Sequence, residues 1–473
     1  MNFQSLSFLV FLAPTTVVCL AAGRKNRRAA MWLLLIACGV FYLWSFDRLA
    51  LGGFLVLLGG AIVTYGAVTA RTAGRALYLG AACWHIGVLL WFKCAGFFDP
   101  ELYHGWMPLG LSFFTFQQLW LLKEARQGNI FLEKEDRGSF LLYSFFFPTV
   151  TSGPILKPQN FFPQLRSQRF LRPDWQDIAA ALYAICLGMA KKVLLADPLG
   201  TVVSNGWAMA GELSAPGAWL VILAYTLQLY LDFSGYCDIA AGCARLLGIR
   251  LPVNFNSPYR ALSVGEFWKR WHITLTTFLR ECLYFPLGGS RKGAGRAYLN
   301  ILIVFLVSGF WHGAGWTFLI WGGLHGLAQI VERAWGRKRA SLPKGVQWGL
   351  TFLFVNLAWV FFRAPSLAAA GTMFASAFAG GWGLPSEQLA AGVLDSEVTA
   401  IGTLLPVLEP AMPGLILTAL LGIGLIVSLW PKNTIRKMEE FRPSVLTAAA
   451  CGVLLVWAVL SFSGVATFIY SNF

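Results

Sequence analysis

The chain alternates between long apolar runs and short polar, mostly basic segments. A membrane-spanning helix needs about 20 mainly apolar residues. The pattern predicts spanning helices near 5–22, 30–46, 50–70, 76–98, 108–122, 177–195, 216–234, 298–316, 317–332, 347–363, 414–430 and 445–468. Several of these runs are short for a full crossing, which leaves the number of spans open.

The basic segments predict the orientation of the helices. By the positive-inside rule, the clusters Arg24–Arg28, Lys123–Arg137 and Lys157–Arg172 lie in the cytoplasm. The first cluster follows the first apolar run, so we expect no cleaved signal peptide and an external N-terminus. Cytoplasmic charge flanks the apolar stretch 138–150 on both sides, which indicates a re-entrant or interfacial segment. The Gly- and Pro-rich run Thr149–Pro158 would break a helix there.

A second apolar stretch, residues 298–332, also has basic residues on both sides. This predicts a hairpin of two short segments with its bend at 308–316 (SGFWHGAGW), where three glycines let backbones approach closely. His312 lies at this bend, deep in the membrane. Residues 364–413 are poorer in spanning signal and predict an external loop with a short interfacial helix. No internal repeat supports an inverted-repeat transporter.

The composition agrees with a membrane protein. Hydrophobic residues make up 57% of the chain, charged residues only 12%, and the mean hydropathy is +0.62. The net charge of +15 is spread over loops and forms no continuous stripe, so we expect no nucleic-acid partner. The nine cysteines show no CxxC spacing and lie mostly in apolar runs, which predicts neither a disulfide framework nor a zinc site.

Ionisable and amide side chains gather between Tyr230 and Gly326, where they are costly and therefore point to a functional site. They include Asp232, Asp238, Arg245, Asn254, Asn256, Glu266, His272, Arg280, His312 and His325. We expect Glu266–Leu283 to form one helix with His272, Thr276 and Arg280 on one face. Trp268 and Trp271 would join an interfacial aromatic belt. The alternative is an amphipathic helix on the cytoplasmic surface.

The histidines are the candidates for chemistry. His312 and His325 are thirteen residues apart and would point to different faces of one helix, so we expect no pair. His325 is interpreted as a core imidazole bonded to a backbone carbonyl, and His85 and His104 as structural. No HExxH, GxSxG or Walker motif occurs, and no metal site is predicted. An imidazole can act as the base in acyl transfer from a thioester to a hydroxyl, with backbone N–H groups at Gly313–Gly315 as oxyanion donors.

Several segments resemble the membrane-bound O-acyltransferase family. They are SFFTFQQLW (112–120), FFFPTVTSGPILKP (145–158), residues 228–289 with FWKRWH, and SGFWHGAGWTFLIWGGLHG (308–326). The branch they resemble includes the alginate O-acetylation protein. The resemblance covers residues 1–473 as a single domain, with its motif core at about 105–330. It implies an all-α, polytopic bundle of about eleven spans with re-entrant helices around a through-membrane tunnel. His312 and His272, forty residues apart, match its catalytic positions.

The resemblance also implies a reaction. Acetyl-CoA would be the donor on the cytoplasmic side of the bacterial inner membrane, with no bound cofactor. The acceptor would be an exported polysaccharide, alginate- or cellulose-like, or an extracytoplasmic SGNH-type acetyltransferase. Basic residues at 245–296 would either hold the coenzyme A phosphates or only set topology. D-alanyl transfer to a cell-wall polymer, a transporter and a secretion scaffold are the alternatives.

Overall fold

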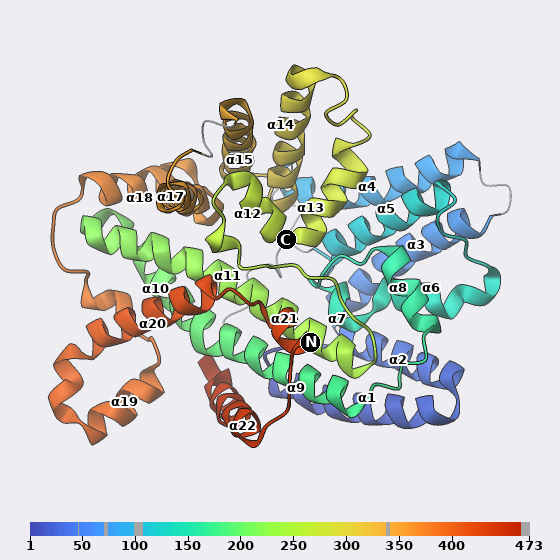
Figure 1. Ribbon diagram of the computed structural model, residues 1–473, viewed down its shortest axis with the longest axis horizontal. Coiled ribbons are helices and arrows are strands. Elements are labelled where there is room, and N and C mark those ends of the chain that lie inside the picture. The colour runs from blue at the N-terminus through green and yellow to red at the C-terminus, as the bar shows by residue number, and fades with distance from the viewer. Residues whose placement is uncertain (46, 71–73, 99–106, 337–340, 465–473) are drawn as a thin grey trace.

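The computed structural model describes residues 1–473 except 46, 71–73, 99–106, 337–340 and 465–473. All regular elements among the described residues are helices, so the predicted all-α class is confirmed (Figure 1). The N-terminal half contains α1 (Leu6–Lys25), α2 (Arg27–Tyr42), α3 (Arg48–Thr69), α4 (Arg75–Phe98), α5 (Leu111–Arg126), α6 (Arg137–Phe145), α7 (Phe147–Val150), α8 (Pro158–Arg166), α9 (Trp175–Met189), the π-helix η2 (Ala190–Ala196), α10 (Asp197–Ala208) and α11 (Ala215–Leu246).

The C-terminal half continues the helical pattern. It contains α12 (Val264–Arg270), α13 (Ile273–Leu279), the π-helix η5 (Arg280–Tyr284), α14 (Gly293–His312), α15 (Trp316–Trp335), α17 (Lys344–Arg363), α18 (Leu367–Ala379), α19 (Asp395–Leu404), α20 (Met412–Leu429), α21 (Thr434–Glu439) and α22 (Val445–Leu460). Short 3₁₀ turns occur at Lys134–Asp136, Ala210–Glu212, Pro258–Arg260, Glu387–Ala390, Pro406–Ala411 and Ser461–Gly464.

Within the described residues, eight helices are long and apolar enough to cross a membrane. They are Leu6–Lys25, Arg48–Thr69, Arg75–Ala95, Trp175–Ala208, Ala215–Leu246, Gly293–His312, Lys344–Arg363 and Pro406–Leu429. Helices α18 and α22 are apolar but shorter. The protein is therefore a multi-pass membrane protein, as the hydrophobic pattern predicts.

Helix α11 crosses the centre of the molecule and is buried along most of its length (Figure 1). Small residues let it pack closely on α9. A Cβ on Gly188 would lie 2.6 Å from the Gly235 carbonyl oxygen, and a Cβ on Gly242 would lie 2.7 Å from the Ala181 oxygen. Glycine at these positions lets the two backbones come into contact. In lipid no hydrophobic effect drives helices together, so this close packing is what holds α9 against α11.

The stretch 138–150 is broken, as its flanking charges predict. Helix α6 ends at Phe145, the chain turns at Phe146, and α7 follows for one turn. Residues 140 and 142–156 are buried in the protein. Non-helical backbone is tolerated at membrane depth only where protein surrounds it, and the burial of this stretch meets that condition.

The predicted hairpin is formed by α14 and α15, which are joined at Gly313–Gly315. Gly309 and Gly322 face each other where the helices cross. A Cβ on Gly309 would lie 2.3 Å from the Phe318 carbonyl oxygen, and one on Gly322 would lie 2.3 Å from the Phe305 oxygen. Both helices therefore approach more closely than any larger residue would allow.

Two predictions of secondary structure are wrong. Glu266–Leu283 is not one helix, because α12 ends at Arg270 and His272 adopts a left-handed conformation with φ 44°. His272, Thr276 and Arg280 therefore do not share a continuous face. Residues 364–413 contain two helices of 13 and 10 residues, α18 and α19, with 3₁₀ turns between and after them, and so hold more helix than a loop.

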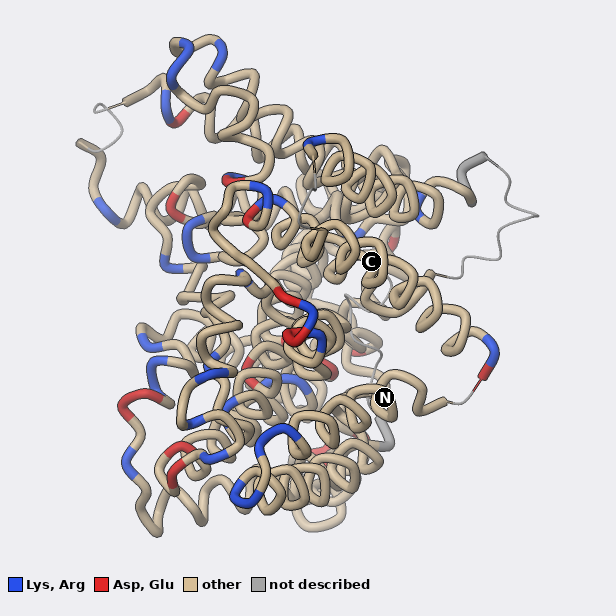
Figure 2. The backbone as a smooth tube through the Cα atoms, turned by 90° about the vertical axis from the view of Figure 1, so that its right-hand side faces the viewer, with Lys and Arg blue, Asp and Glu red and all other residues tan. Residues whose placement is uncertain are grey.

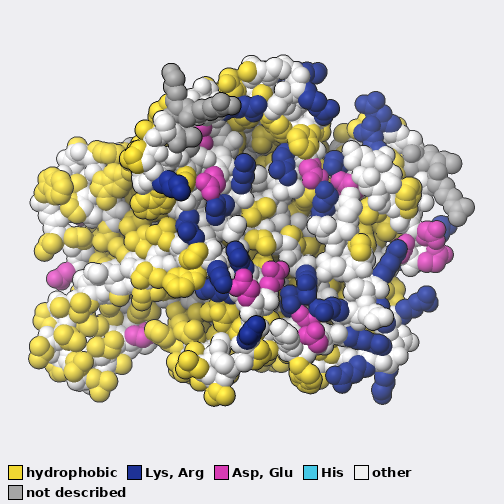
Figure 3. Space-filling view, viewed as in Figure 1, with side chains coloured by type: hydrophobic (Ala, Val, Ile, Leu, Met, Phe, Trp, Pro, Cys, Tyr) yellow, Lys and Arg dark blue, Asp and Glu magenta, His cyan; other side chains and the backbone are white. Residues whose placement is uncertain are grey.

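Charge is distributed unevenly over the molecule. Most Lys and Arg residues lie along the left side of Figure 2, which corresponds to the face turned to the viewer in Figure 1. Figure 3 shows this basic side directly, with blue side chains over the centre and right and apolar side chains over α19 and α20 at lower left. The positive-inside rule predicts that this is the cytoplasmic side.

Candidate active site

His312 is the last residue of α14 and is only 4% exposed. Aromatic rings surround its imidazole. The centroids of Trp311, Trp321 and Phe362 lie 4.6, 5.2 and 5.1 Å from the His312 centroid. The helix stops directly after it because Gly313 takes an extended conformation, and a Cβ there would lie 2.3 Å from the Phe318 ring. The structure thus places His312 at the bend, as predicted.

His272 is held at a sharp turn between α12 and α13 and is 1% exposed. Its Nδ1 lies 3.3 Å from Asn254 Oδ1. The same oxygen accepts hydrogen bonds from the Thr274 backbone N–H (3.2 Å) and hydroxyl (2.8 Å). Because this oxygen is an acceptor, His272 donates from Nδ1, and Nε2 carries the lone pair of the neutral ring.

Backbone hydrogen bonds explain why the chain turns at His272. The Ile273 N–H donates to the Asn254 carbonyl (3.0 Å), and the Asn256 N–H donates to the Arg270 carbonyl (2.9 Å). The extended strand-like segment 251–255 therefore competes for groups that a continuous helix would use. The opposite end of α12 is fixed by Glu332 of α15, whose carboxylate accepts from Val264 N–H (2.7 Å) and Gly265 N–H (3.0 Å).

The two histidines converge on Trp311. The Trp311 ring centroid lies 6.4 Å from that of His272 and 4.6 Å from that of His312, and the two imidazoles are close enough to interact electrostatically. Phe113 of α5 stacks on His272 at 6.2 Å and meets Trp311 edge-on at 5.6 Å. Residues forty positions apart in the sequence therefore form one buried cluster, which requires the hairpin and the broken helix together.

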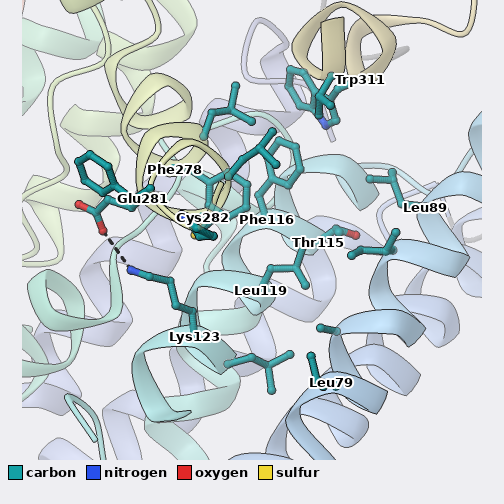
Figure 4. A pocket seen from close by; sticks show the side chains of 18 of the residues that line it. Leu79, Leu89, Thr115, Phe116, Leu119, Lys123, Phe278, Glu281, Cys282 and Trp311 are labelled. Carbon is teal, nitrogen blue, oxygen red and sulfur yellow. Dashed lines mark hydrogen bonds and ion pairs between the residues drawn. The ribbon is translucent and has the colours of Figure 1, made fainter. Parts of the chain in front are cut away.

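A cavity of about 1060 Å³ leads towards this cluster. We call it the donor-side cavity; it is lined by α4, α5, α13, η5 and α14. Figure 4 shows Lys123 paired with Glu281 at one end of it and Trp311 at the other, with Phe116 and Phe278 between them. Trp311 and Phe310 line its inner end, whereas His272 and His312 are not lining residues. The histidines therefore lie behind the Trp311 ring.

The lining is apolar inside and cationic at the rim. Its charged residues are Lys93, Lys123, Arg126 and Arg291 against Glu281. Lys93 lies deep in the cavity, with its ammonium 5.8 Å from the Trp311 ring centroid. Sequence reasoning missed Lys93, although a lysine within the apolar run 76–98 is itself a signal of function.

The geometry bears on three expectations about the site. The Gly313 N–H donates to the Gly309 carbonyl (3.2 Å), so it is not an available oxyanion donor. The donor-side cavity ends at Trp311, so the through-membrane tunnel stays a prediction. Trp268 and Trp271 are 5% and 1% exposed, so they pack inside the protein and do not belong to an interfacial belt.

The remaining histidines have structural positions where they are described. His325 is fully buried and its Nδ1 accepts from Trp268 Nε1 (3.1 Å), so its partner is an indole and not a backbone carbonyl. His312 and His325 do not share one helix, and both pack against Trp321. His85 contacts the Thr64 hydroxyl at 2.7 Å. His104 lies outside the described residues.

A group of buried charges near the centre of the bundle was also missed. Lys192 Nζ lies 2.5 Å from Asp197 Oδ1 and 2.7 Å from Asp232 Oδ1, and all three side chains are at most 6% exposed. We call these three residues the buried charge triad. They come from η2, α10 and α11, and only Asp232 lies in the polar region that the sequence indicated. Charges buried this way persist because they pair with each other.

The fold is that of a multi-pass membrane protein, and it buries two imidazoles of the kind that can serve in acid–base chemistry. Residues 74–370 match the membrane-bound O-acyltransferase family. A Helicobacter pylori protein named peptidoglycan O-acetyltransferase is 37% identical over 384 residues, which cover 72% of this chain and 72% of the relative. The chain therefore belongs to the membrane-bound O-acyltransferase family and is an acyltransferase.

Other relatives carry related names. A Pseudomonas fluorescens protein named probable alginate O-acetylase AlgI is 35% identical over 408 residues, covering 85% of this chain and 80% of the relative. A Streptococcus thermophilus protein named teichoic acid D-alanyltransferase is 30% identical over 251 residues, covering 50% of this chain and 59% of the relative. The family resemblance seen in the sequence motifs is confirmed.

Proposed function

We propose that this chain transfers acetyl groups from cytoplasmic acetyl-CoA to a hydroxyl on the other side of the bacterial inner membrane. The acceptor is an exported polysaccharide, or an SGNH-type acetyltransferase that passes the acetyl group on to it. The observation that carries the proposal is the cluster of His272, Trp311 and His312 at the inner end of the donor-side cavity.

The donor-side cavity suits an acyl thioester of coenzyme A. The nucleotide phosphates are too charged for hydrocarbon and would stay at the rim, where Lys123, Arg126 and Arg291 supply positive charge. The pantetheine arm is slender and would lie along the apolar wall towards Trp311. Of the basic residues at 245–296 that the sequence pointed to, Arg291 lines this cavity, whereas Lys123 and Arg126 come from α5.

The chemistry needs a base and a stabiliser for the developing charge. His312 takes the proton from the acceptor hydroxyl as the oxygen attacks the thioester carbonyl. The new C–O bond forms, the C–S bond breaks, and the proton passes from the imidazole to the leaving thiolate. His272, held by Asn254, orients His312 or stabilises the charge that forms. Lys93 is the positive group that we assign to the oxyanion.

The names of the relatives support a polysaccharide acceptor. Those with the broadest coverage here are named for O-acetylation of peptidoglycan or alginate. Alginate-like, cellulose-like and peptidoglycan acceptors all present sugar hydroxyls, so the same chemistry serves each of them. D-alanyl transfer is the second candidate, supported by the relative named teichoic acid D-alanyltransferase, which matches half of this chain.

Reconstituted vesicles test the proposal. The purified chain receives acetyl-labelled coenzyme A on one side, with oligosaccharide or an SGNH-type partner on the other. We expect label on the acceptor with the native chain and none with His312→Ala. A labelled D-alanyl thioester of a carrier protein serves as the competing donor. If the native chain moves D-alanyl and not acetyl, or moves solute with no acyl transfer, the proposal is wrong.

A further inference from the structure

A second cavity, of about 650 Å³, lies on another part of the molecule. We call it the α20–α22 cavity. It shares no lining residue with the donor-side cavity. Helix α20 packs on α11, and α22 packs on α9 and η2, and the cavity lies between them. Its position among α9, α20, α21 and α22 can be followed in Figure 1.

The body of the α20–α22 cavity is apolar. Its walls are leucine, isoleucine, valine and alanine side chains: Leu187, Ala190, Leu194, Leu195, Ile416, Ala419, Leu420, Ile423, Ile426, Val427 and Leu454. The eleven-residue step from Ile416 to Val427 rises about 17 Å along α20. This is close to the thickness of one leaflet, since a bilayer's hydrocarbon core is about 30 Å thick.

Two tryptophans are among the lining residues. Trp430 lies just beyond the end of α20, and Trp457 lies near the end of α22. Both are partly exposed, at 50% and 41%. Tryptophan is enriched at membrane–water interfaces, so we expect the part of the cavity beside Trp430 to lie at such an interface.

Basic residues gather at the Trp430 end only. Lys191, Lys432 and Lys437 line the cavity there, and no carboxylate is among its described lining residues. Lys191 pairs with Asp238 (2.6 Å) and Lys432 with Glu440 (2.5 Å). Lys437 has no carboxylate partner in the described part of the chain, and its ammonium lies 5.5 Å from the Trp430 ring centroid.

The electrostatics of this end favour an anion. Burial, followed by the positive charge of Lys191, lowers the pKa of Lys437. An anion at this position would reverse that effect. Arg436 of α21 adds a further positive charge at the same end, paired with Glu440. The basic end faces the cytoplasmic side by the positive-inside rule, where anionic lipids are attracted to basic segments.

We propose that the α20–α22 cavity binds an anionic phospholipid from the cytoplasmic leaflet. The acyl chains lie against α9 and α20, and the phosphate lies at Lys437 beside Trp430. A soluble anion would not need the long apolar wall, and a neutral lipid would not need the lysines. Bound lipid would join α20, α21 and α22 to the central helices and stabilise the folded protein by mass action.

The experiment measures lipid retention by the full-length chain purified in mild detergent. The probes are phosphatidylglycerol and phosphatidylcholine with the same acyl chains, counted by native mass spectrometry. We expect the native chain to retain phosphatidylglycerol preferentially. Lys437→Gln should lower this retention about fivefold, since one basic residue near a lipid surface contributes about 1 kcal/mol. Lys344→Gln, at an exposed residue that begins α17 and does not line the cavity, is the matched control and should change nothing.

A second pair of variants tests the apolar wall. Ile423→Trp would fill the cavity, whereas Leu415→Trp places the same bulk on α20 at a residue that does not line it. Only Ile423→Trp should lower phosphatidylglycerol retention. Equal retention of both lipids by the native chain would overturn the proposal. So would retention that survives both Lys437→Gln and Ile423→Trp, or binding of inorganic phosphate alone with the same dependence on Lys437.

Discussion

Asn254 holds His272 in place through a single side-chain oxygen. Its Oδ1 lies 3.3 Å from His272 Nδ1 and also accepts both hydrogen bonds from Thr274 that begin α13. The amide therefore joins the start of a helix to the orientation of an imidazole. Sequence spacing did not predict this contact, because the two residues are eighteen positions apart with helix α12 between them.

Removing this amide should impair turnover more than donor binding. In Asn254→Ala, His272 loses the acceptor that fixes its tautomer and ring position. We expect kcat to fall about 100-fold, the cost of a misplacement of about 1 Å in a catalytic geometry. The KM for acetyl-CoA should stay near its native value, because Asn254 does not line the donor-side cavity. Steady-state acetyl transfer separates the two parameters.

Asn256→Ala is the matched control, because its side chain contacts Asn433 and not His272. Activity of Asn256→Ala should be close to native. A rise in KM with unchanged kcat in Asn254→Ala would show that His272 is not positioned through this amide. Asn254→Asp, which keeps an acceptor oxygen, should recover part of the lost kcat.

His312 and His325 provide a comparison between two buried imidazoles in neighbouring positions. Both pack against Trp321, at 5.2 and 5.1 Å between ring centroids. His312→Ala should insert and fold yet give no detectable acyl transfer, since a general base contributes about 10²–10⁴-fold. His325→Gln should keep activity with lowered stability, because the glutamine oxygen can still accept from Trp268. The measurements are acyl transfer and thermal unfolding in detergent.

Loss of activity in His325→Gln together with full activity in His312→Ala would reverse these assignments. A shared loss in both variants with normal unfolding would indicate that the two imidazoles act together through Trp321.

Eight of the twelve predicted spans correspond to helices of the described residues that are long and apolar enough to cross a membrane, because such runs must form helices in lipid. The runs at 30–46, 108–122, 317–332 and 445–468 form helices that do not meet both criteria. The bend at His312 was also predictable, from three glycines in nine residues. The break at His272 was not, because the local periodicity favoured a helix. The competing hydrogen bonds come from Asn254 and Asn256, whose approach depends on the tertiary fold.

The contacts of two buried lysines were likewise only partly predictable from the sequence. Lys93, and Lys192 beside Lys191, were visible as lysines within apolar runs and could have been singled out on that ground alone. The residues that these lysines contact could not be predicted from the sequence. Lys93 meets Trp311 from a different helix, and Lys192 meets Asp232 across the contact of η2 with α11. Trp268 and Trp271 were assigned to an interface because tryptophan prefers that depth, whereas here aromatic packing buries them.

Substitutions of charged residues in the donor-side cavity should change KM at the rim and kcat at the inner end. Arg126→Gln at the rim should raise the KM for acetyl-CoA several-fold with little change in kcat, because it would bind the nucleotide phosphates in both ground and transition states. Its effect should vanish with acetyl-pantetheine, which has no nucleotide. An equal rise in KM for both donors would show that Arg126 does not bind the nucleotide phosphates.

Lys93→Met should lower kcat with both donors, since its ammonium lies at the inner end beside Trp311. Removal of one group that stabilises an oxyanion costs about 10²–10³-fold. Lys93→Arg keeps the charge and should retain part of the activity. A change in KM alone, present with acetyl-CoA and absent with acetyl-pantetheine, would place Lys93 in phosphate binding and not at the reacting carbonyl.

The buried charge triad predicts an asymmetry in stability. Lys192 pairs with both Asp197 and Asp232, so the three groups together carry one excess negative charge when all are ionised. Lys192→Met would remove the ammonium that pairs with both buried carboxylates and should cost about 3–5 kcal/mol. Asp197→Asn leaves one balanced pair and should cost far less.

Thermal and denaturant unfolding of the purified variants measure this difference. Arg166→Met serves as the control, because Arg166 and Asp136 form an ion pair at the surface, at 73% and 23% side-chain exposure. Exposed pairs contribute at most about 1 kcal/mol. Equal destabilisation by Lys192→Met and Asp197→Asn would contradict the counter-ion role of Lys192. A different outcome is expected if Asp197 already carries a proton in the folded protein, because Asp197→Asn then removes no charge. The Asp197→Asn/Lys192→Met double variant would then be no more stable than Lys192→Met alone.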